Sequence, residues 1–203
     1  MIAIIDYNIG NLGAVANMFT RIGANCEITC DPQIIRQASG IVLPGNGSFD
    51  ACMGAFLNSG LQAVVEQQVT VAGVPLLGIC VGAQMLGISS EEGKLPGLGW
   101  LKIKTRRFPE IKDLRVPHMG WTNIKVRKFS DALCKALDQN SRFYFVHSFY
   151  LEPLDEEDIL FEAHYGIDFA AAVSHNNIWG VQFHPEKSHR FGKQLLAAFA
   201  DVC

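Results

Sequence analysis

The stretch that decides the fold is Pro75-Leu-Leu-Gly-Ile-Cys80-Val-Gly82-Ala-Gln84, an apolar run that ends in Gly-x-Cys-x-Gly. An apolar strand that leads through this pattern into helix-forming residues is typical of a nucleophile elbow, the sharp strand-to-helix turn that lifts one side chain above the end of a sheet. Glycines at Gly78 and Gly82 leave room where the backbone turns and neighbouring elements pack closely. Because the residue at the apex is a thiol, the pattern predicts covalent acyl chemistry at Cys80.

Apolar strands alternate with helical segments around this elbow. We expect strands at 2–5, 26–29, 40–44 and 74–79, and helices at 11–22, 50–71 and 82–88. Strands that are apolar throughout and alternate with helices indicate a parallel sheet covered on both faces. Further strands are expected at 101–105, 123–128, 142–147, 170–174 and 178–183, followed by a helix at 188–202. The first two of these alternate apolar with basic residues, as half-exposed antiparallel strands do. Residues 1–203 should therefore form a single α/β domain with a mixed sheet, parallel in its first half and antiparallel in its second.

The composition excludes several classes of protein. Hydrophobic residues make up 49% of the 203 residues and charged residues 18%, which fits a well-packed globular chain and not a disordered one. The net charge of −3 gives no reason to expect a nucleic-acid partner. Residues 102–128 nevertheless hold nine Lys or Arg against two acids. This excess indicates either surface strands with basic outer faces or a patch that faces a partner or a phosphate.

The cysteines and the hydropathy indicate in which cellular compartment the protein is expected. The six cysteines show no spacing of a metal site, and residues 1–6 do not resemble a signal peptide, so we expect reduced thiols in a cytoplasmic protein. The uncharged run 71–88 has the length of a membrane span, but Pro75, Gln84 and the elbow within it favour a buried strand and helix, and no membrane association is expected. Neither Gly-x-x-x-x-Gly-Lys nor Gly-x-Gly-x-x-Gly is present, so no nucleotide cofactor is expected, and the cysteine spacing gives no reason to expect a metal.

A cysteine nucleophile needs a base, and the best placed of the six histidines is His184, in Gly180-Val-Gln-Phe-His184-Pro-Glu186. In an extended segment, side chains two residues apart point to the same side, so His184 and Glu186 should face one way. A carboxylate beside an imidazole fixes its tautomer and stabilises the imidazolium. The imidazolium in turn favours the thiolate, the nucleophilic form of cysteine. The pattern predicts a Cys80-His184-Glu186 triad.

Acyl transfer also needs hydrogen-bond donors for the oxyanion. The loop Pro44-Gly45-Asn46-Gly47 follows a predicted parallel strand, so it should lie at the same carboxyl edge of the sheet as the elbow. Backbone N–H groups of Asn46 or Gly47, together with that of Val81, are candidates for stabilising the developing charge.

These residues together resemble the class I, triad-type glutamine amidotransferases. The resemblance rests on Pro44-Gly-Asn-Gly47, Gly78-Ile-Cys-Val-Gly-Ala-Gln84 and His184-Pro-Glu186. Further stretches make the chain most similar to the glutaminase subunits of imidazole glycerol phosphate synthases: 5–12, 97–100, 116–121, 144–148 and 184–188. The resemblance covers nearly the whole chain, and it implies the flavodoxin-like fold of that family. It also implies that Cys80 attacks the glutamine carboxamide, that His184 passes a proton to the departing ammonia, and that water then releases glutamate from a thioester.

The same resemblance implies further site residues and a partner. It assigns Gln84, Ser148 and Phe149 to the neighbourhood of bound L-glutamine, and Gly47 to the oxyanion strand. Glutaminases of this kind pass ammonia to a synthase, here implied to be a (β/α)8-barrel cyclase of histidine biosynthesis that forms a heterodimer with the chain. The positions that match the expected interface are Asn11, Trp121, Lys187 and the segment 117–120 with His118. For Trp121, a place in the core is an equally good interpretation.

Two positions depart from the family pattern. Asn46 stands where valine is more usual, and Thr122 follows Trp121 where asparagine is common. Neither change removes a catalytic group. They leave open a paralogous glutaminase subunit that feeds a different synthase, for instance one that modifies a sugar. A non-catalytic subunit that only stabilises its partner is a further alternative, and the presence of Cys80, His184 and Glu186 speaks against it.

Overall fold

The computed structural model describes residues 1–203, and its centre is a five-stranded parallel sheet. In the order in which the strands lie side by side, these are β2 (Cys26–Thr29), β1 (Ile2–Ile5), β3 (Gly40–Gly45), β4 (Leu76–Cys80) and β12 (Ile178–Val181). Every residue of β1, β3, β4 and β12 is buried, as expected for parallel strands covered on both faces.

The second half of the sheet is antiparallel, apart from the parallel pairing of the short β5 (Ser89–Ser90) with β6 (Ile103–Arg107). It continues from β12 through β11 (Ile167–His175), β10 (Ile159–Tyr165), β7 (His118–Val126) and β8 (Arg142–His147). A branch of β9 (Phe149–Pro153), β6 and β5 joins β11 through β9. The expected mixed sheet, parallel first and antiparallel afterwards, is confirmed.

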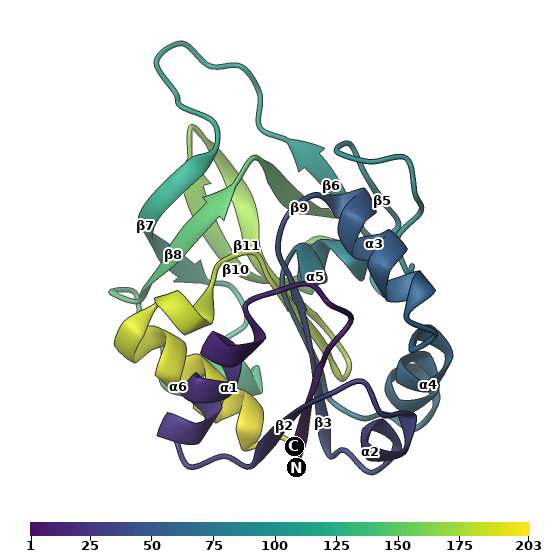
Figure 1. Cartoon of the computed structure of the whole chain (residues 1–203). Coiled ribbons are helices and arrows are strands. Elements are labelled where there is room, and N and C mark those ends of the chain that lie inside the picture. Colours follow the sequence, from purple (N-terminus) through teal and green to yellow (C-terminus); the bar gives the residue numbers. More distant parts are fainter.

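Helices cover both faces of the parallel strands (Figure 1). On one face lie α1 (Leu12–Arg21) and α6 (His189–Ala200), and on the other lie α2 (Pro32–Arg36), α3 (Phe49–Asn58) and α4 (Gln62–Glu66). The short α5 (Val81–Met85) begins directly at the end of β4. One-turn segments complete the list: a π-helix at Gln67–Val71 and 3₁₀ helices at Ala132–Cys134, Glu156–Asp158 and Pro185–Lys187. One continuous cluster of 56 buried residues forms the core. No helix is both long and apolar enough to cross a lipid bilayer.

Several predicted boundaries were wrong, and local chemistry explains them. The helix expected at 50–71 is interrupted after Asn58, because Gly60 adopts a left-handed conformation with φ +73° that ends the helix. The helix expected at 82–88 ends at Met85, where Gly87 approaches Ile103 so closely that a Cβ would lie 2.7 Å from its carbonyl oxygen. The strand expected at 123–128 begins earlier, at His118. Strands β9 and β10 and helix α2 were not predicted.

Four of the nine basic residues in the stretch 102–128 lie on strands β6 and β7: Lys104, Arg106, Arg107 and Lys125. Arg106 of β6 pairs with Glu91 and Glu152 at 2.8 and 2.7 Å, and Lys125 and Arg127 contact Glu162. These partners favour the interpretation of a surface strand over that of a phosphate patch.

Candidate functional site

Cys80 stands at a strained turn between β4 and α5. Its backbone has φ 55° and ψ −115°, a left-handed conformation that non-glycine residues rarely adopt outside functional turns. Close packing around the turn requires glycine at Gly82, where a Cβ would lie 1.9 Å from the Leu43 carbonyl oxygen. At Gly78 a Cβ would lie 2.9 Å from the backbone of Ala83. The sequence thus forces the β4–α5 junction into the shape of a nucleophile elbow, with the thiol at its apex.

His184 reaches the same edge of the sheet from the neighbouring strand. β12 is parallel to β4 with Val181 opposite Ile79, so the residues that follow both strands emerge together. The N–H of His184 donates to the Tyr144 carbonyl at 2.9 Å, and its own carbonyl accepts from the Ser188 hydroxyl at 2.6 Å. These two hydrogen bonds hold the segment in place on the edge of the sheet.

Glu186 contacts His184 as predicted, but not through an extended segment. Residues 185–187 form a turn of 3₁₀ helix, which brings the Glu186 Oε1 within 2.8 Å of the His184 Nδ1. The two side chains are 6% and 3% exposed, so water hardly competes for this contact. The carboxylate can only accept, so Nδ1 carries the proton and the buried Nε2, which makes no other hydrogen bond, is left for the chemistry.

The charge state of His184 follows from its neighbours. Burial alone lowers the pKa of His184, but the interactions with Cys80 and Glu186 outweigh it and raise this pKa to about 9. The imidazole is therefore protonated at neutral pH. A protonated imidazole can act as the acid that a departing nitrogen needs.

The loop after β3 offers backbone donors beside the elbow. Neither the Asn46 nor the Gly47 N–H makes a hydrogen bond within the chain. The Asn46 carbonyl accepts from the Cys52 thiol of α3 with a sulfur–oxygen distance of 3.4 Å. Because carbonyl and N–H point in opposite directions across a trans peptide, this contact turns the Gly47 N–H away from Cys52. Both N–H groups predicted for the oxyanion therefore stay without a partner within the chain.

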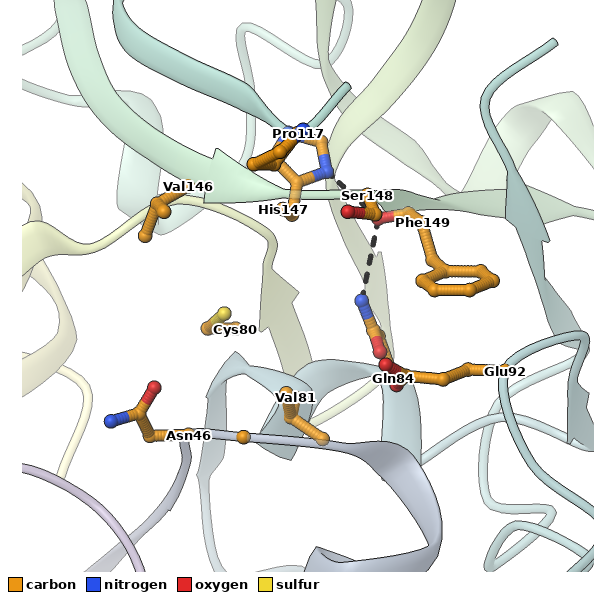
Figure 2. A pocket seen from close by; sticks show the side chains of 11 residues that line it. Asn46, Cys80, Val81, Gln84, Glu92, Pro117, Val146, His147, Ser148 and Phe149 are labelled. Carbon is orange, nitrogen blue, oxygen red and sulfur yellow. Dashed lines mark hydrogen bonds between the residues drawn. The ribbon is translucent and has the colours of Figure 1, made fainter. Parts of the chain in front are cut away.

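A pocket of about 170 Å³ opens above the thiol (Figure 2). Seven of the residues that line it were expected at the site: Asn46, Gly47, Cys80, Val81, Gln84, Ser148 and Phe149. Gly45, also expected there, lies outside this pocket, and it borders a smaller cavity of about 50 Å³ with His184 and Glu186. No group of three or more His, Cys, Asp or Glu side chains is placed to hold a metal ion.

Sequence reasoning missed two polar residues around the thiol. The Glu92 carboxylate borders the pocket and accepts from the Phe49 N–H at 2.8 Å, but nothing in Ser89-Ser-Glu-Glu-Gly93 distinguishes Glu92 from Glu91. Gln182, fully buried on the way from β12 to His184, accepts from the Gln84 amide at 3.1 Å and lies 3.9 Å from the Cys80 sulfur. An amide in an otherwise apolar strand was the available signal for Gln182.

The residues expected at a partner interface divide into exposed and buried. Asn11 and Lys187 are exposed, and both border the small cavity behind the histidine. Trp121 is 42% exposed and stacks on His189, so it does not belong to the core. His118 is only 2% exposed, so its predicted place at a partner interface is wrong. Because side chains alternate along β7, His118 points inward where Met119 and Trp121 point outward, so the His118 side chain is not available to a partner.

The chain is similar to known proteins over nearly its whole length. The model of the family "Glutamine amidotransferase class-I" matches residues 3–202. The chain is 45% identical over 202 residues to the imidazole glycerol phosphate synthase subunit HisH 2 of Pseudomonas aeruginosa, with all of both chains covered. It is 47% identical to the HisH 2 subunit of Methanococcus maripaludis and 43% to the HisH subunit of Bdellovibrio bacteriovorus, over 98% and 100% of each chain.

Solved structures share the fold at low sequence identity. A crystal structure of a glutamine amidotransferase superimposes with a TM-score of 0.77 at 18% identity, covering 100% of this chain and 98% of the other. The structure of PurLQS from Thermotoga maritima gives 0.75 at 15% identity, with 98% and 97% covered.

Proposed function

Because the chain belongs to the class I glutamine amidotransferase family, we propose that Cys80, His184 and Glu186 are the triad with which it hydrolyses glutamine. The chain is a glutamine-hydrolysing enzyme, with the function of a glutaminase subunit of imidazole glycerol phosphate synthase. The observation that supports the triad best is the buried 2.8 Å contact between His184 and Glu186 at the edge where the Cys80 elbow ends.

The reaction follows from the charges in the site. The Cys80 thiolate attacks the carboxamide carbon of glutamine, and the negative charge on the carbonyl oxygen develops toward the N–H groups of Val81 and Gly47. His184 then donates its proton to the departing amide nitrogen, which leaves as ammonia, and a thioester remains on Cys80. Now neutral, His184 takes a proton from water as that water attacks the thioester, and glutamate leaves. Glu186 keeps the imidazole oriented through both steps.

The pocket suits the two charged groups of a free amino acid. Glu92 supplies a carboxylate for the α-ammonium group. The buried Gln84 Oε1 makes no hydrogen bond within the chain, so it is an acceptor available to a ligand. Ser148 and Phe149 form the opposite wall, where polar backbone groups can hold the α-carboxylate (Figure 2).

The ammonia passes to a partner subunit, a (β/α)8-barrel cyclase that forms a heterodimer with this chain. The relatives named above are subunits of a synthase, Asn11 and Lys187 are exposed residues that border the small cavity beside His184, and Trp121 is exposed as well. A partner seated there encloses the pocket, so that ammonia reaches the cyclase without crossing bulk water.

The experiment is to purify the chain with the cyclase subunit and to supply glutamine labelled with ¹⁵N in its amide. We expect the label in the imidazole ring of the product, and no label when Cys80→Ala replaces the native chain, with ammonium salts restoring the synthesis. Release of labelled ammonia without its incorporation points instead to a paralogue that serves another synthase. Incorporation at the native rate with Cys80→Ala contradicts the triad, whereas absence of labelled ammonia and of incorporation with the native chain favours a non-catalytic subunit.

A further inference from the structure

Two buried histidines outside the triad face each other across β7 and β8. His118 and His147 are opposite in the ladder, and the His118 Nδ1 lies 3.0 Å from the His147 Nε2. Both residues are buried, and the mechanism uses neither of them. His147 lines the pocket above Cys80, whereas His118 stacks against Phe145 and Tyr165.

The hydrogen-bond partners of the two rings, Thr122 on one side and Phe149 on the other, determine which nitrogen of each ring donates and which accepts. The Phe149 carbonyl, 2.7 Å from the His147 Nδ1, can only accept, so Nδ1 carries the proton and the His147 Nε2 is an acceptor. That acceptor requires a proton on the His118 Nδ1. The His118 Nε2 then accepts from the Thr122 hydroxyl at 2.8 Å. Burial lowers the pKa of His118 to about 4 and that of His147 to about 3, so both rings are neutral at neutral pH and this order of protons persists.

At its other end, this series of hydrogen bonds reaches a wall of the pocket. The Phe149 carbonyl that accepts from His147 also accepts from the Gln84 Nε2 at 3.4 Å, and Figure 2 shows both hydrogen bonds meeting at this oxygen. Gln84 donates further to Gln182, whose amide lies beside the Cys80 sulfur. The backbone at 148–149 is thereby tied to the residues on the opposite side of the pocket.

The structure assigns His118 a positioning role in glutamine binding: through His147 it holds the Phe149 carbonyl and with it the Ser148–Phe149 wall of the pocket. This inference rests on the proposed function, because it takes the pocket to be the glutamine site. His118 does not touch the pocket itself, so it acts on the ground-state complex and on the transition state alike. Loss of its hydrogen bond therefore raises KM and leaves kcat nearly unchanged.

Two substitutions separate hydrogen bonding from packing. His118→Phe keeps an aromatic ring against Phe145 and Tyr165 but removes the donor to His147. His118→Asn places an amide donor where the Nδ1 stood but loses the ring. If His118 acts by hydrogen bonding, the phenylalanine variant raises the glutamine KM about tenfold, because a buried acceptor is left unpaired, and the asparagine variant stays within about threefold of the native value. His164→Phe, at an exposed histidine of β10, is the matched control.

The measurements are glutamine KM and kcat of each variant in complex with the cyclase subunit, and glutamine affinity by calorimetry in the Cys80→Ala background. An unchanged KM for His118→Phe, or a larger increase for His118→Asn than for His118→Phe, overturns the inference. Absence of glutamine hydrolysis by the native complex contradicts the proposed function instead.

The native protein gives a second readout that does not depend on any variant folding. We expect the ¹⁵N spectrum of the histidine rings to show His118 and His147 as neutral Nδ1–H tautomers at pH 7. Since imidazole in solution prefers the Nε2–H form, this result is not expected by default. An Nε2–H tautomer on either ring contradicts the proposed chain of hydrogen bonds.

Discussion

Glu186→Gln is the substitution that tests the electrostatics of the site most sharply. The amide keeps the size of the side chain but removes the charge that stabilises the His184 imidazolium. Burial lowers the pKa of His184, and Cys80 and Glu186 together raise it from 6.5 to about 9. At about 1.4 kcal/mol per pKa unit, the net stabilisation of the imidazolium is about 3 kcal/mol. Because Glu186 shares this effect with Cys80, we expect kcat to fall by about ten- to a hundredfold.

The assay is glutamine hydrolysis at saturating glutamine in the presence of the partner, together with an NMR titration of the His184 ring. We expect the pKa of His184 to fall well below 9 in the variant, because burial then outweighs the single remaining partner. The matched control is Asp168→Asn, which removes the carboxylate 2.6 Å from His164 in a pair that is 69% exposed on both sides. This control should leave kcat unchanged. A decrease of less than about threefold in Glu186→Gln, with the His184 pKa still near 9, would refute the reasoning.

Three further predictions concern stability, pH and the partner. Gly82→Ala places a Cβ 1.9 Å from the Leu43 carbonyl oxygen and should lower the free energy of unfolding by about 3 kcal/mol in urea denaturation. Gly54→Ala, with open space at the Cβ position, should change it by less than about 1 kcal/mol, and similar losses in both variants would contradict the packing argument. The pKa values of His118 and His147, lowered by burial to about 4 and about 3, mean that the unfolded chain binds more protons than the folded chain below pH 6.5. Stability therefore falls as the pH drops from 7 to 5, and His118→Asn should reduce this fall by about 2 kcal/mol; an identical fall in both proteins argues against a neutral buried His118. Finally, a glutaminase that feeds a synthase should turn over glutamine slowly alone and faster with the cyclase and its ligand, and equal rates would count against that role.

The sequence predicted the elements that have strong local signals and missed those shaped by tertiary contacts. The elbow was readable because Gly78 and Gly82 flank the thiol at fixed spacing. Strand β10 was missed because its register shifts between Ile159 and Glu162, and this bulge destroys the alternation that marks a half-buried strand. The contact of His184 with Glu186 was predicted, but the local turn of 3₁₀ helix that makes it was not.

The candidate site shows the same division. Cys80, Gln84 and Phe149 come together from the end of β4, from α5 and from the junction of β8 and β9, as the motifs implied. His118 was assigned to an interface because the family resemblance placed the segment 117–120 there. Since the strand was expected to begin only at 123, no alternation of side chains indicated that His118 points inward. Glu92 and Gln182 carry no motif, and only the folded chain shows that both lie around the thiol.

We expect Cys80 to be the one reactive nucleophile among the six free cysteines. The most direct measurement is covalent labelling with a diazoketone analogue of glutamine, followed by intact-mass analysis and peptide mapping. We expect a single adduct, located on Cys80, that glutamine protects against and that His184→Ala slows strongly. Equal labelling of the exposed Cys30, or labelling of Cys80 at the same rate without His184, would contradict the claim.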